Sequence, residues 1–299
     1  MNAKSGVMKD YISTTEAARA IGVSESSVKR WCDHGILTAV RTVGGHRRMP
    51  VRDVIRFLRE EDRTIDRAEL LGLPPQTGRR QYSLETAYGK MLQALRDGDE
   101  NRTRRIGIDL FLGGFDISII CDQVLVPVLA EIGDLWHTGD LEIFEEHRSC
   151  ELCKRLLHEF RFLLPEPQAS DPCAVGSSVD GDPYTLPGQM AELVFLESRW
   201  RPISLGHALP LAGLIPAVER LEPSVFWMTL SNIPNPESFL EGYHPFAESV
   251  QRRGIPLIVG GRALTADLRK RMRFSSFGDN FAHLRIFADT FRSMRNDSQ

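Results

Sequence analysis

The 299-residue chain lacks features that would assign it to several large classes of protein. It has no run of 18 apolar residues, which argues against a transmembrane helix, and its first residues include no apolar stretch suited to a signal peptide. Five cysteines, an odd and sparse number, favour a reduced cytosol over a disulfide framework. We therefore expect a cytoplasmic protein with no membrane partner.

Catalytic motifs are missing as well. The sequence contains no nucleophile elbow, no phosphate-binding P-loop and no paired-acid site that calls for catalysis. Its hydrophobic content of 42% and charged content of 26% are ordinary for globular domains, and its length suits two or three of them. These features predict a globular protein that is not an enzyme.

Charge is distributed unevenly along the chain. Residues 1–62 contain 11 Lys and Arg against 8 Asp and Glu, whereas the remainder contains 26 against 32. A basic head on an acidic body suits a head that meets phosphates, although an excess of three charges is weak evidence by itself.

The pattern of apolar residues and breakers divides the chain. Proline and glycine interrupt it twice, and the last part alternates short apolar strands with helices, which is typical of a parallel sheet covered by helices on both faces. We expect a multidomain protein: an all-α winged helix-turn-helix head at 10–62, a linker at 63–83, a four-helix bundle at 84–163 with helices near 84–97, 99–113, 116–136 and 140–163, and an α/β Rossmann-like domain of flavodoxin type at 172–299.

Two short helices open the head. Ser13 and Glu16 form a capping box, and the helix that they begin ends at Gly22. Ser24 caps a second helix, which stops at Gly35, and the pair is typical of a helix-turn-helix. Small hydroxyl and basic side chains near the start of the second helix suit the major groove of DNA: Ser26, Ser27, Lys29 and Arg30.

A hairpin follows the helix pair. Val43 and the adjacent Gly44-Gly45 predict a tight turn between two short strands, with a basic triplet directly after it. A cationic hairpin of this kind can act as a wing that holds backbone phosphates. The predicted contacts with double-stranded operator DNA are therefore completed by Arg41, His46, Arg47 and Arg48. An amphipathic helix from Val51 to Leu58 is expected to pack beneath the wing.

These 50 or so residues resemble the MerR family of transcription regulators. The wing of that family commonly reads GGHRRY, and this chain reads GGHRR with Met49 in place of the tyrosine. The helix pair, the wing and the basic triplet occur in the family's order. Excisionase-type and phage heads share these motifs, so the head does not identify the effector.

The bundle contains one informative string at the junction of its last two helices. Trp136 is followed, after nine intervening residues, by Glu146 and His147. An indole, a carboxylate and an imidazole at one end of a bundle can cover a ligand that stacks and forms hydrogen bonds. The alternative is that Trp136 belongs to the core and the Glu-His pair lies on a solvated face.

The order of head, bundle and Rossmann-like domain resembles the cobalamin-dependent MerR regulators of the CarH/LitR type, which are light-sensing repressors. The resemblance implies that Trp136, Glu146 and His147 cap the adenosyl group of adenosylcobalamin, and that His137 can take the cobalt after photolysis. It also implies repression. We expect the protein to bind repeated half-sites as a homo-oligomer, a dimer or tetramer.

The α/β domain departs from that family at the metal position. The family motif is D/E-x-H-x-x-G, in which the histidine is the lower axial ligand of cobalt. Here Asp182 is followed by Tyr184 at the histidine position, and Pro187 takes the glycine position with Gly188 one residue late. A neutral phenol is a poor ligand for cobalt. The metal ligand is therefore unknown, with His137, Tyr184 and His207 as candidates.

Small residues follow the later strands. In the resembled family such residues line a slot where the corrin tail runs between the sheet and the helices, and any α/β domain also needs them at strand-to-helix turns. Trp200 and Trp227 lie near strands and are expected in the core. The candidate slot residues are Ser204, Gly206, Ser231, Gly260 and Gly261.

The missing histidine leaves several interpretations open. Cobalamin can bind without a protein lower ligand or with another one such as His207, or a different tetrapyrrole can fill the cleft. The pocket can also be vestigial, with no cofactor, which would leave the body as an oligomerisation surface or as the binding surface for an antirepressor protein. His147, Cys150 and Cys153 lie at three-residue steps, a weak metal pattern with no evident fourth ligand.

Overall fold

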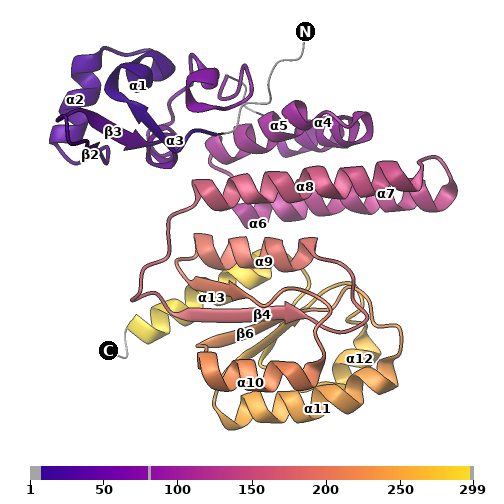
Figure 1. Cartoon of the computed structure of the whole chain (residues 1–299). Coiled ribbons are helices and arrows are strands. Elements are labelled where there is room, and N and C mark those ends of the chain that lie inside the picture. The colour runs from indigo at the N-terminus through magenta and orange to yellow at the C-terminus, as the bar shows by residue number, and fades with distance from the viewer. Residues whose placement is uncertain (1–7, 80–81, 297–299) are drawn as a thin grey trace. The chain divides into compact units, whose positions relative to one another are not determined.

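The computed structural model describes residues 8–79 and 82–296, which form two compact units, Met1–Leu164 and Pro165–Gln299 (Figure 1). Arg80 and Gln81 of the predicted linker and the last three residues of the predicted α/β domain lie outside the described residues. No helix among the described residues is long and apolar enough to cross a membrane.

The head has the two helices, the hairpin and the third helix that the sequence predicts. It also has a strand that was not predicted: β1 pairs antiparallel with β3, so β3 lies in the middle of a sheet ordered β1-β3-β2. The elements are β1 (Tyr11–Ser13), α1 (Thr14–Ile21), α2 (Glu25–Asp33), β2 (Val40–Arg41), β3 (Arg47–Pro50) and α3 (Val51–Glu60). A three-residue strand is too short to show a period-2 pattern.

The predicted linker is a packed connection rather than a free spacer. It contains a 3₁₀ turn, η1 (Ala68–Leu71), and Ile65, Ala68 and Leu71 are almost fully buried. Gly78 N donates to Asp109 Oδ1 at 2.6 Å, which ties the segment to the bundle. The three apolar residues recur every third position, so one side of the segment can be buried despite the prolines and glycine that favoured a linker.

Four long helical segments form the bundle, as predicted. The third is continuous from α6 through a π-helical segment to α7, and the left-handed Gly98 and Gly139 end the first and third segments. The elements are α4 (Leu84–Asp97), α5 (Glu100–Leu112), α6 (Ile117–Ile120), η2 (Cys121–Leu125), α7 (Val126–Thr138) and α8 (Ile143–Leu163).

Head and bundle are joined through the end of α3. The Arg59 guanidinium lies 4.1 Å from the ring centroid of Phe111 on α5 and donates to the carbonyl oxygen of Phe115 at 3.2 Å. Because cation–π and carbonyl contacts act together, α3 serves both as the support of the wing and as the link to the bundle.

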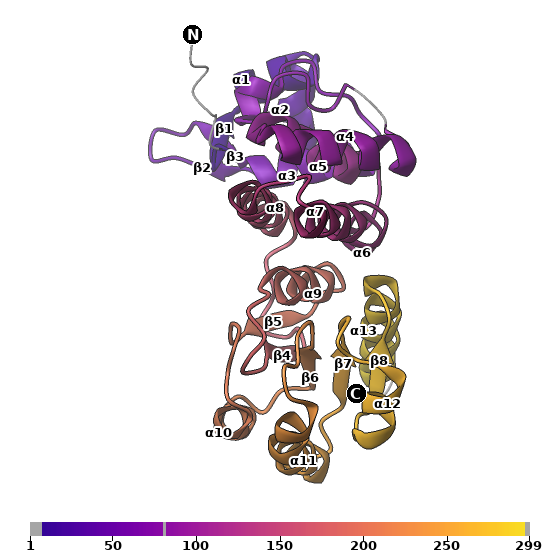
Figure 2. The same ribbon diagram turned by 90° about the vertical axis from the view of Figure 1, so that its right-hand side faces the viewer.

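The second unit is an all-parallel sheet with strand order β5-β4-β6-β7-β8, the flavodoxin-type order (Figure 2). Helices α10 and α11 cover one face, and α9 and α13 cover the other (Figure 2). The strands are β4 (Cys173–Ser178), β5 (Arg201–Ser204), β6 (Val225–Thr229), β7 (Leu257–Gly260) and β8 (Ser276–Gly278). The helices are α9 (Leu186–Glu197), α10 (Leu211–Leu221), α11 (Pro236–Arg252), α12 (Ala266–Arg271) and α13 (Phe281–Asn296).

Alternate side chains of β6 point to the two faces of this sheet. Phe226 and Met228 belong to the apolar cluster on the side of α10 and α11. Trp227 points the other way, where its ring centroid lies 5.1 Å from that of Phe195 on α9. Trp227 and Trp200 are 2% and 0% exposed, so both belong to the core, as predicted.

Candidate DNA-binding surface and cobalamin-binding region

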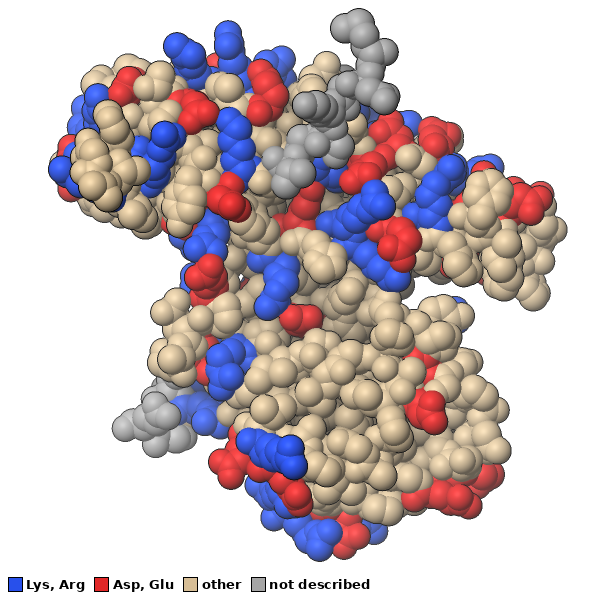
Figure 3. Space-filling model, in the orientation of Figure 1, with Lys and Arg blue, Asp and Glu red and all other residues tan. Residues whose placement is uncertain are grey.

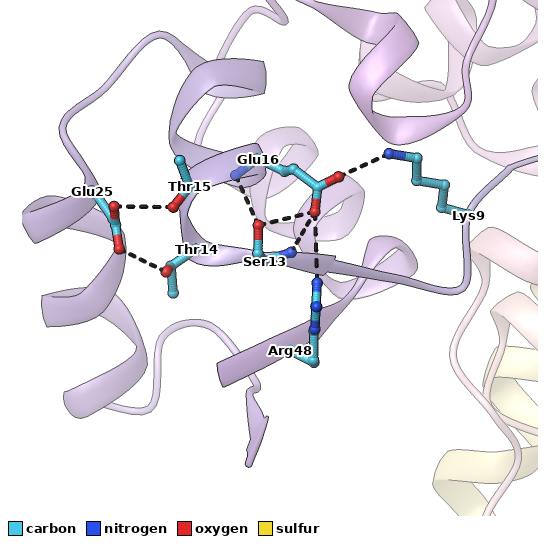
Figure 4. A network of polar contacts seen from close by, with 7 residues as sticks. All are labelled: Lys9, Ser13, Thr14, Thr15, Glu16, Glu25 and Arg48. Carbon is cyan, nitrogen blue, oxygen red and sulfur yellow. Dashed lines mark hydrogen bonds and ion pairs between the residues drawn. The ribbon is translucent and has the colours of Figure 1, made fainter. Parts of the chain in front are cut away.

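The two helices of the helix-turn-helix are held together by Glu25. Its carboxylate accepts hydrogen bonds from the hydroxyls of Thr14 and Thr15, each at 3.0 Å (Figure 4). It also lies 2.9 Å from Lys29 Nζ. The bond from Lys29, followed by those from the threonines, holds the pKa of Glu25 below its usual value. The first two turns of α2 are therefore tied to the start of α1.

A second carboxylate, Glu16, connects β1, α1 and the wing. It accepts from Ser13 N and Ser13 Oγ at 2.9 Å each and from Lys9 Nζ at 3.0 Å, and it lies 3.8 Å from Arg48 (Figure 4). The backbone bond from Ser13, then the Lys9 bond, lowers the pKa of Glu16 to about 2. This is the capping box that the sequence predicts, with two cations added to it.

Most of the predicted DNA contacts are exposed. Ser26 and Lys29 lie on the open side of α2, and Arg30 and Arg41 form no ion pair within residues 8–79 and 82–296. Figure 3 shows Lys and Arg interspersed with acidic side chains over the head. The exposed members of the predicted set are Ser26, Lys29, Arg30, Arg41, His46 and Arg48.

The other two predicted contacts, Arg47 and Ser27, are only partly exposed. The Arg47 guanidinium donates to Lys29 O at 2.9 Å and lies 2.5 Å from Asp33 Oδ1, so it fastens the hairpin against α2. Ser27 is half-buried, with its hydroxyl 2.9 Å from that of Ser24. Asp33 is 14 residues from Arg47 in the sequence, so no local pattern indicates this pairing.

The hairpin turn has the predicted geometry. Thr42 N donates to His46 O at 2.9 Å, and Gly45 N donates to Thr42 O at 2.8 Å, with Gly45 at a φ of +78°. That φ favours glycine. Met49, at the position of the family's tyrosine, is fully buried and accepts a weak hydrogen bond from Cys32 Sγ at 3.7 Å. The substitution thus changes the core beneath the wing rather than its exposed surface.

In the bundle, the turn between α7 and α8 brings the predicted ligand residues to one end. Trp136 is 46% exposed, so it does not belong to the core. His147 Nδ1 lies 2.7 Å from Glu146 Oε2, and Cys150 Sγ donates to Glu146 Oε1 at 3.3 Å. Burial, with the nearby Glu146 charge, raises the pKa of Cys150 to about 12, so this thiol stays protonated. His137, beside Trp136, is exposed.

Large apolar side chains are exposed around this turn. Trp136 lies in the last turn of α7, and the first two residues of α8, Ile143 and Phe144, are 54% and 63% exposed. An exposed group of large apolar side chains is typical of a surface that binds a ligand or another protein. The bundle therefore presents an exposed indole, a carboxylate–imidazole pair and exposed apolar side chains near the turn between α7 and α8.

At the carboxyl edge of the sheet, Asp182 is fully buried and its oxygens bind backbone. Oδ2 accepts from Ser231 N at 2.7 Å and Oδ1 accepts from Tyr184 N at 3.1 Å. The loops after β4 and β6 are thereby tied together. Tyr184 is 43% exposed, and its ring centroid lies 4.5 Å from the guanidinium of Arg262, which also donates to Ser231 O.

The small residues of the predicted slot make room for backbone. A Cβ at Gly261, whose φ is +125°, would lie 2.3 Å from Leu230 O, and one at Gly260 would lie 3.0 Å from Gly278 O. Gly206 N donates to Ser204 Oγ at 3.3 Å in the loop that also presents the exposed His207. These contacts are those of strand-to-helix turns.

The α/β unit fits a corrinoid poorly in two respects. Tyr184 offers no imidazole nitrogen to a cobalt ion, and the space between the sheet and α9 is filled by Trp227, over which a Cβ at Gly176 would come within 2.0 Å. Among the described residues, no three His, Cys, Asp or Glu side chains are grouped to hold a metal ion, and this includes the weak pattern at His147, Cys150 and Cys153.

Comparisons with known proteins match the head and the bundle to separate domain families. Residues 11–62 match the family model of a helix-turn-helix domain, and residues 88–159 match that of a B12 binding domain. The HTH-type transcriptional repressor CarH of Myxococcus xanthus is 26% identical over 272 residues, covering 83% of this chain and 87% of that protein. Over most of its length the chain is thus similar to a helix-turn-helix repressor, with one region like a helix-turn-helix domain and another like a B12 binding domain.

Solved structures support the fold. The monomethylamine corrinoid protein of Methanosarcina barkeri matches with a TM-score of 0.55 at 11% identity, covering 70% of this chain and 99% of that one. A cobalamin-binding protein of Desulfitobacterium hafniense covers the same share of this chain at 15% identity, with a TM-score of only 0.37. The first likeness confirms the predicted helical region followed by a parallel five-stranded α/β domain.

Proposed function

We propose that the chain is a repressor that binds operator DNA through α2 and the wing, and that it does so in the bacterial cytoplasm as a homo-oligomer. The observation that carries the proposal is the placement of exposed cations on both elements. Arg47 fastens the hairpin beside α2, so Arg30 on the helix and Arg41 on the hairpin belong to one rigid head. Exposed cations without ionic partners are available to phosphates and base edges.

Fluorescence anisotropy with a labelled fragment of DNA from upstream of the protein's own gene tests this proposal. Arg30→Ala should weaken specific binding about tenfold or more at fixed salt. Arg102→Ala, which removes the same charge from a half-buried arginine on α5 in the bundle, is the control and should leave affinity unchanged. Equal affinity of the wild-type chain for this fragment and for a scrambled one would refute operator recognition.

The same proposal assigns a corrinoid to the B12-binding domain as the effector. The exposed Trp136 and the Glu146–His147 pair support contact with the upper, adenosyl-bearing face. A bound corrinoid changes DNA occupancy only if it favours one assembly state over another. Light dependence would follow from a light-sensitive adenosyl group, and we expect a signal rather than catalytic turnover.

Gel filtration after mixing with adenosylcobalamin in the dark tests the effector. A coloured protein peak, weakened by Trp136→Ala, supports the assignment. The anisotropy titration is then repeated in the dark and after illumination. A colourless protein whose operator affinity is the same with and without the cofactor contradicts it.

A second candidate is a regulator that responds to a partner protein and needs no cofactor. The exposed Ile143 and Phe144 favour it, because apolar side chains at the end of a bundle also suit an antirepressor surface. Replacing both residues with serine should then leave any effect of cobalamin on operator affinity unchanged. The same replacement should prevent the antirepressor from releasing the protein from DNA. Colourless protein together with an unaltered operator complex would select this candidate.

A further inference from the structure

The face of the sheet beneath α9 is closed by an aromatic side chain. Gly176, in β4, is the register partner of Trp227 in β6, and a Cβ at Gly176 would lie 2.0 Å from two carbons of the indole. Trp227 is 2% exposed, and the Phe195 ring of α9 lies against it, tilted by 35°. The indole is therefore held between the glycine of one strand and the helix above.

The gap is filled toward the carboxyl edge as well. Thr229 follows Trp227 on the same face of β6 and is 7% exposed. A Cβ at Gly188, near the start of α9, would lie 3.8 Å from Thr229 Oγ1, so the first turn of the helix packs directly on this threonine. Trp227 and Thr229 therefore both occupy this face of the sheet beneath α9.

The family resemblance places the nucleotide tail of a corrinoid between sheet and helices. The base that ends such a tail is a flat bicyclic heteroaromatic, close in size and shape to an indole. We propose that Trp227 occupies the position of this base, so that it acts as a specificity-determining residue that closes the α/β unit to a corrinoid's nucleotide tail. Any cobalamin that the chain takes up binds with its tail outside the sheet-helix gap.

Buried polar atoms around the indole support this placement. Trp227 Nε1 and Thr229 Oγ1 are buried and have no hydrogen-bond partner within the described chain. Thr229 lies beneath Gly188 of α9, so its hydroxyl belongs to the same gap as the indole. Once the indole is removed, this hydroxyl is left to receive the polar edge of a heteroaromatic base. The vacated gap should prefer such a base over a hydrocarbon of equal size.

The experiment titrates the full chain with 5,6-dimethylbenzimidazole and follows thermal unfolding. The wild-type chain should show no saturable rise in Tm, whereas Trp227→Ala should gain one. Phe246→Ala is the matched control, because Phe246 is equally buried but faces the opposite side of the sheet, where its ring lies 5.1 Å from Phe226. Its apolar cavity should give a smaller response to this base than Trp227→Ala gives.

Saturable binding to the wild-type chain, or no response in Trp227→Ala, would overturn the proposal. If Trp227→Ala does not fold, Trp227→Leu repeats the titration with less volume removed. Electron paramagnetic resonance of the wild-type chain mixed with cob(II)alamin gives a second reading: nitrogen coupling from the cofactor's own base supports a tail outside, and its loss refutes it. If no cobalamin binds, the proposal of a corrinoid effector is wrong. The titration with 5,6-dimethylbenzimidazole still tests the role of Trp227.

Discussion

In the head, Arg30 and Arg41 are exposed and form no ion pair within the described chain, whereas in the α/β unit the buried Asp182 gives both oxygens to backbone amides. The same contrast holds for the aromatic side chains. Trp136 of the bundle is exposed at a candidate site, and Trp227 of the sheet fills one. The predicted site residues of the two regions therefore differ in whether their side chains are available to a ligand. This difference is visible in the contacts of the structure and not in the sequence motifs.

The largest expected effect concerns the filled gap. Gly176→Ala should destabilise the α/β unit by about 3 kcal/mol, because its methyl group would overlap the Trp227 indole. Trp227→Ala alone should cost about 3–5 kcal/mol through the cavity that it leaves. In the Trp227→Ala background, Gly176→Ala should cost below about 1 kcal/mol. Chemical denaturation of the four proteins measures this coupling, and additive costs would show that the indole does not lie over Gly176.

The next effect concerns Glu16 in the head. Its pKa is lowered from 4.5 to about 2, so the carboxylate stabilises the fold above pH 4.5, and this contribution is lost as the pH falls from 4.5 toward 2. Glu16→Gln should destabilise the head by about 1–2 kcal/mol at pH 7, allowing for solvent screening of a one-third exposed side chain. Unfolding at pH 7 and pH 3 should show a smaller gap between variant and wild type at the lower pH. A gap independent of pH would contradict the assignment.

A smaller effect separates two arginines of the wing. Arg41→Ala should weaken operator binding by about 1 kcal/mol and reduce the salt dependence by about one ion, without lowering Tm. Arg47→Ala should lower the Tm of the head, because it removes the contacts to Lys29 O and Asp33. Anisotropy at several salt concentrations and thermal unfolding of both variants measure the two effects. Equal changes of operator affinity and of Tm in the two variants would show that Arg41 and Arg47 do not have separate roles in phosphate contact and in holding the hairpin to α2.

The smallest effect is expected at Tyr184. Its ring is exposed beside Arg262, but the gap beneath α9 stays closed in Tyr184→His. A bound cobalamin should therefore keep its own base on cobalt, and the absorption spectrum should change little in this variant. Tyr184→His combined with Trp227→Ala should shift the spectrum toward histidine ligation. A full shift in the single variant would show that the filled gap does not control ligation.

The sequence predicts local features well and long-range partners poorly. Caps at Ser13 and Ser24, the glycine of the wing turn and the alternation of strands with helices are local, and the structure confirms each. The partner of Arg47 lies 14 residues away, and strand β1 depends on pairing with a segment about 37 residues later, between Ile12 and Met49. Neither leaves a periodic signal.

The filled gap illustrates the same limit at the candidate site. The sequence predicts that Trp227 is buried, but which face of the sheet it covers depends on the register between β4 and β6. A shift of that register by one residue would move the indole to the face of the sheet that α11 covers. The roles of the predicted ligand residues stay predictions, because they depend on what binds as well as on where the side chains lie.

Hydroxyl-radical footprinting of DNA from upstream of the protein's own gene, with the purified full-length chain at fixed salt, tests the central claim of operator binding most directly. The account predicts a protected region that is lost in the double variant Arg30→Ala/Arg41→Ala and retained in Arg102→Ala. A protected region that survives loss of both exposed arginines, or no protected region with the wild-type chain, would contradict it.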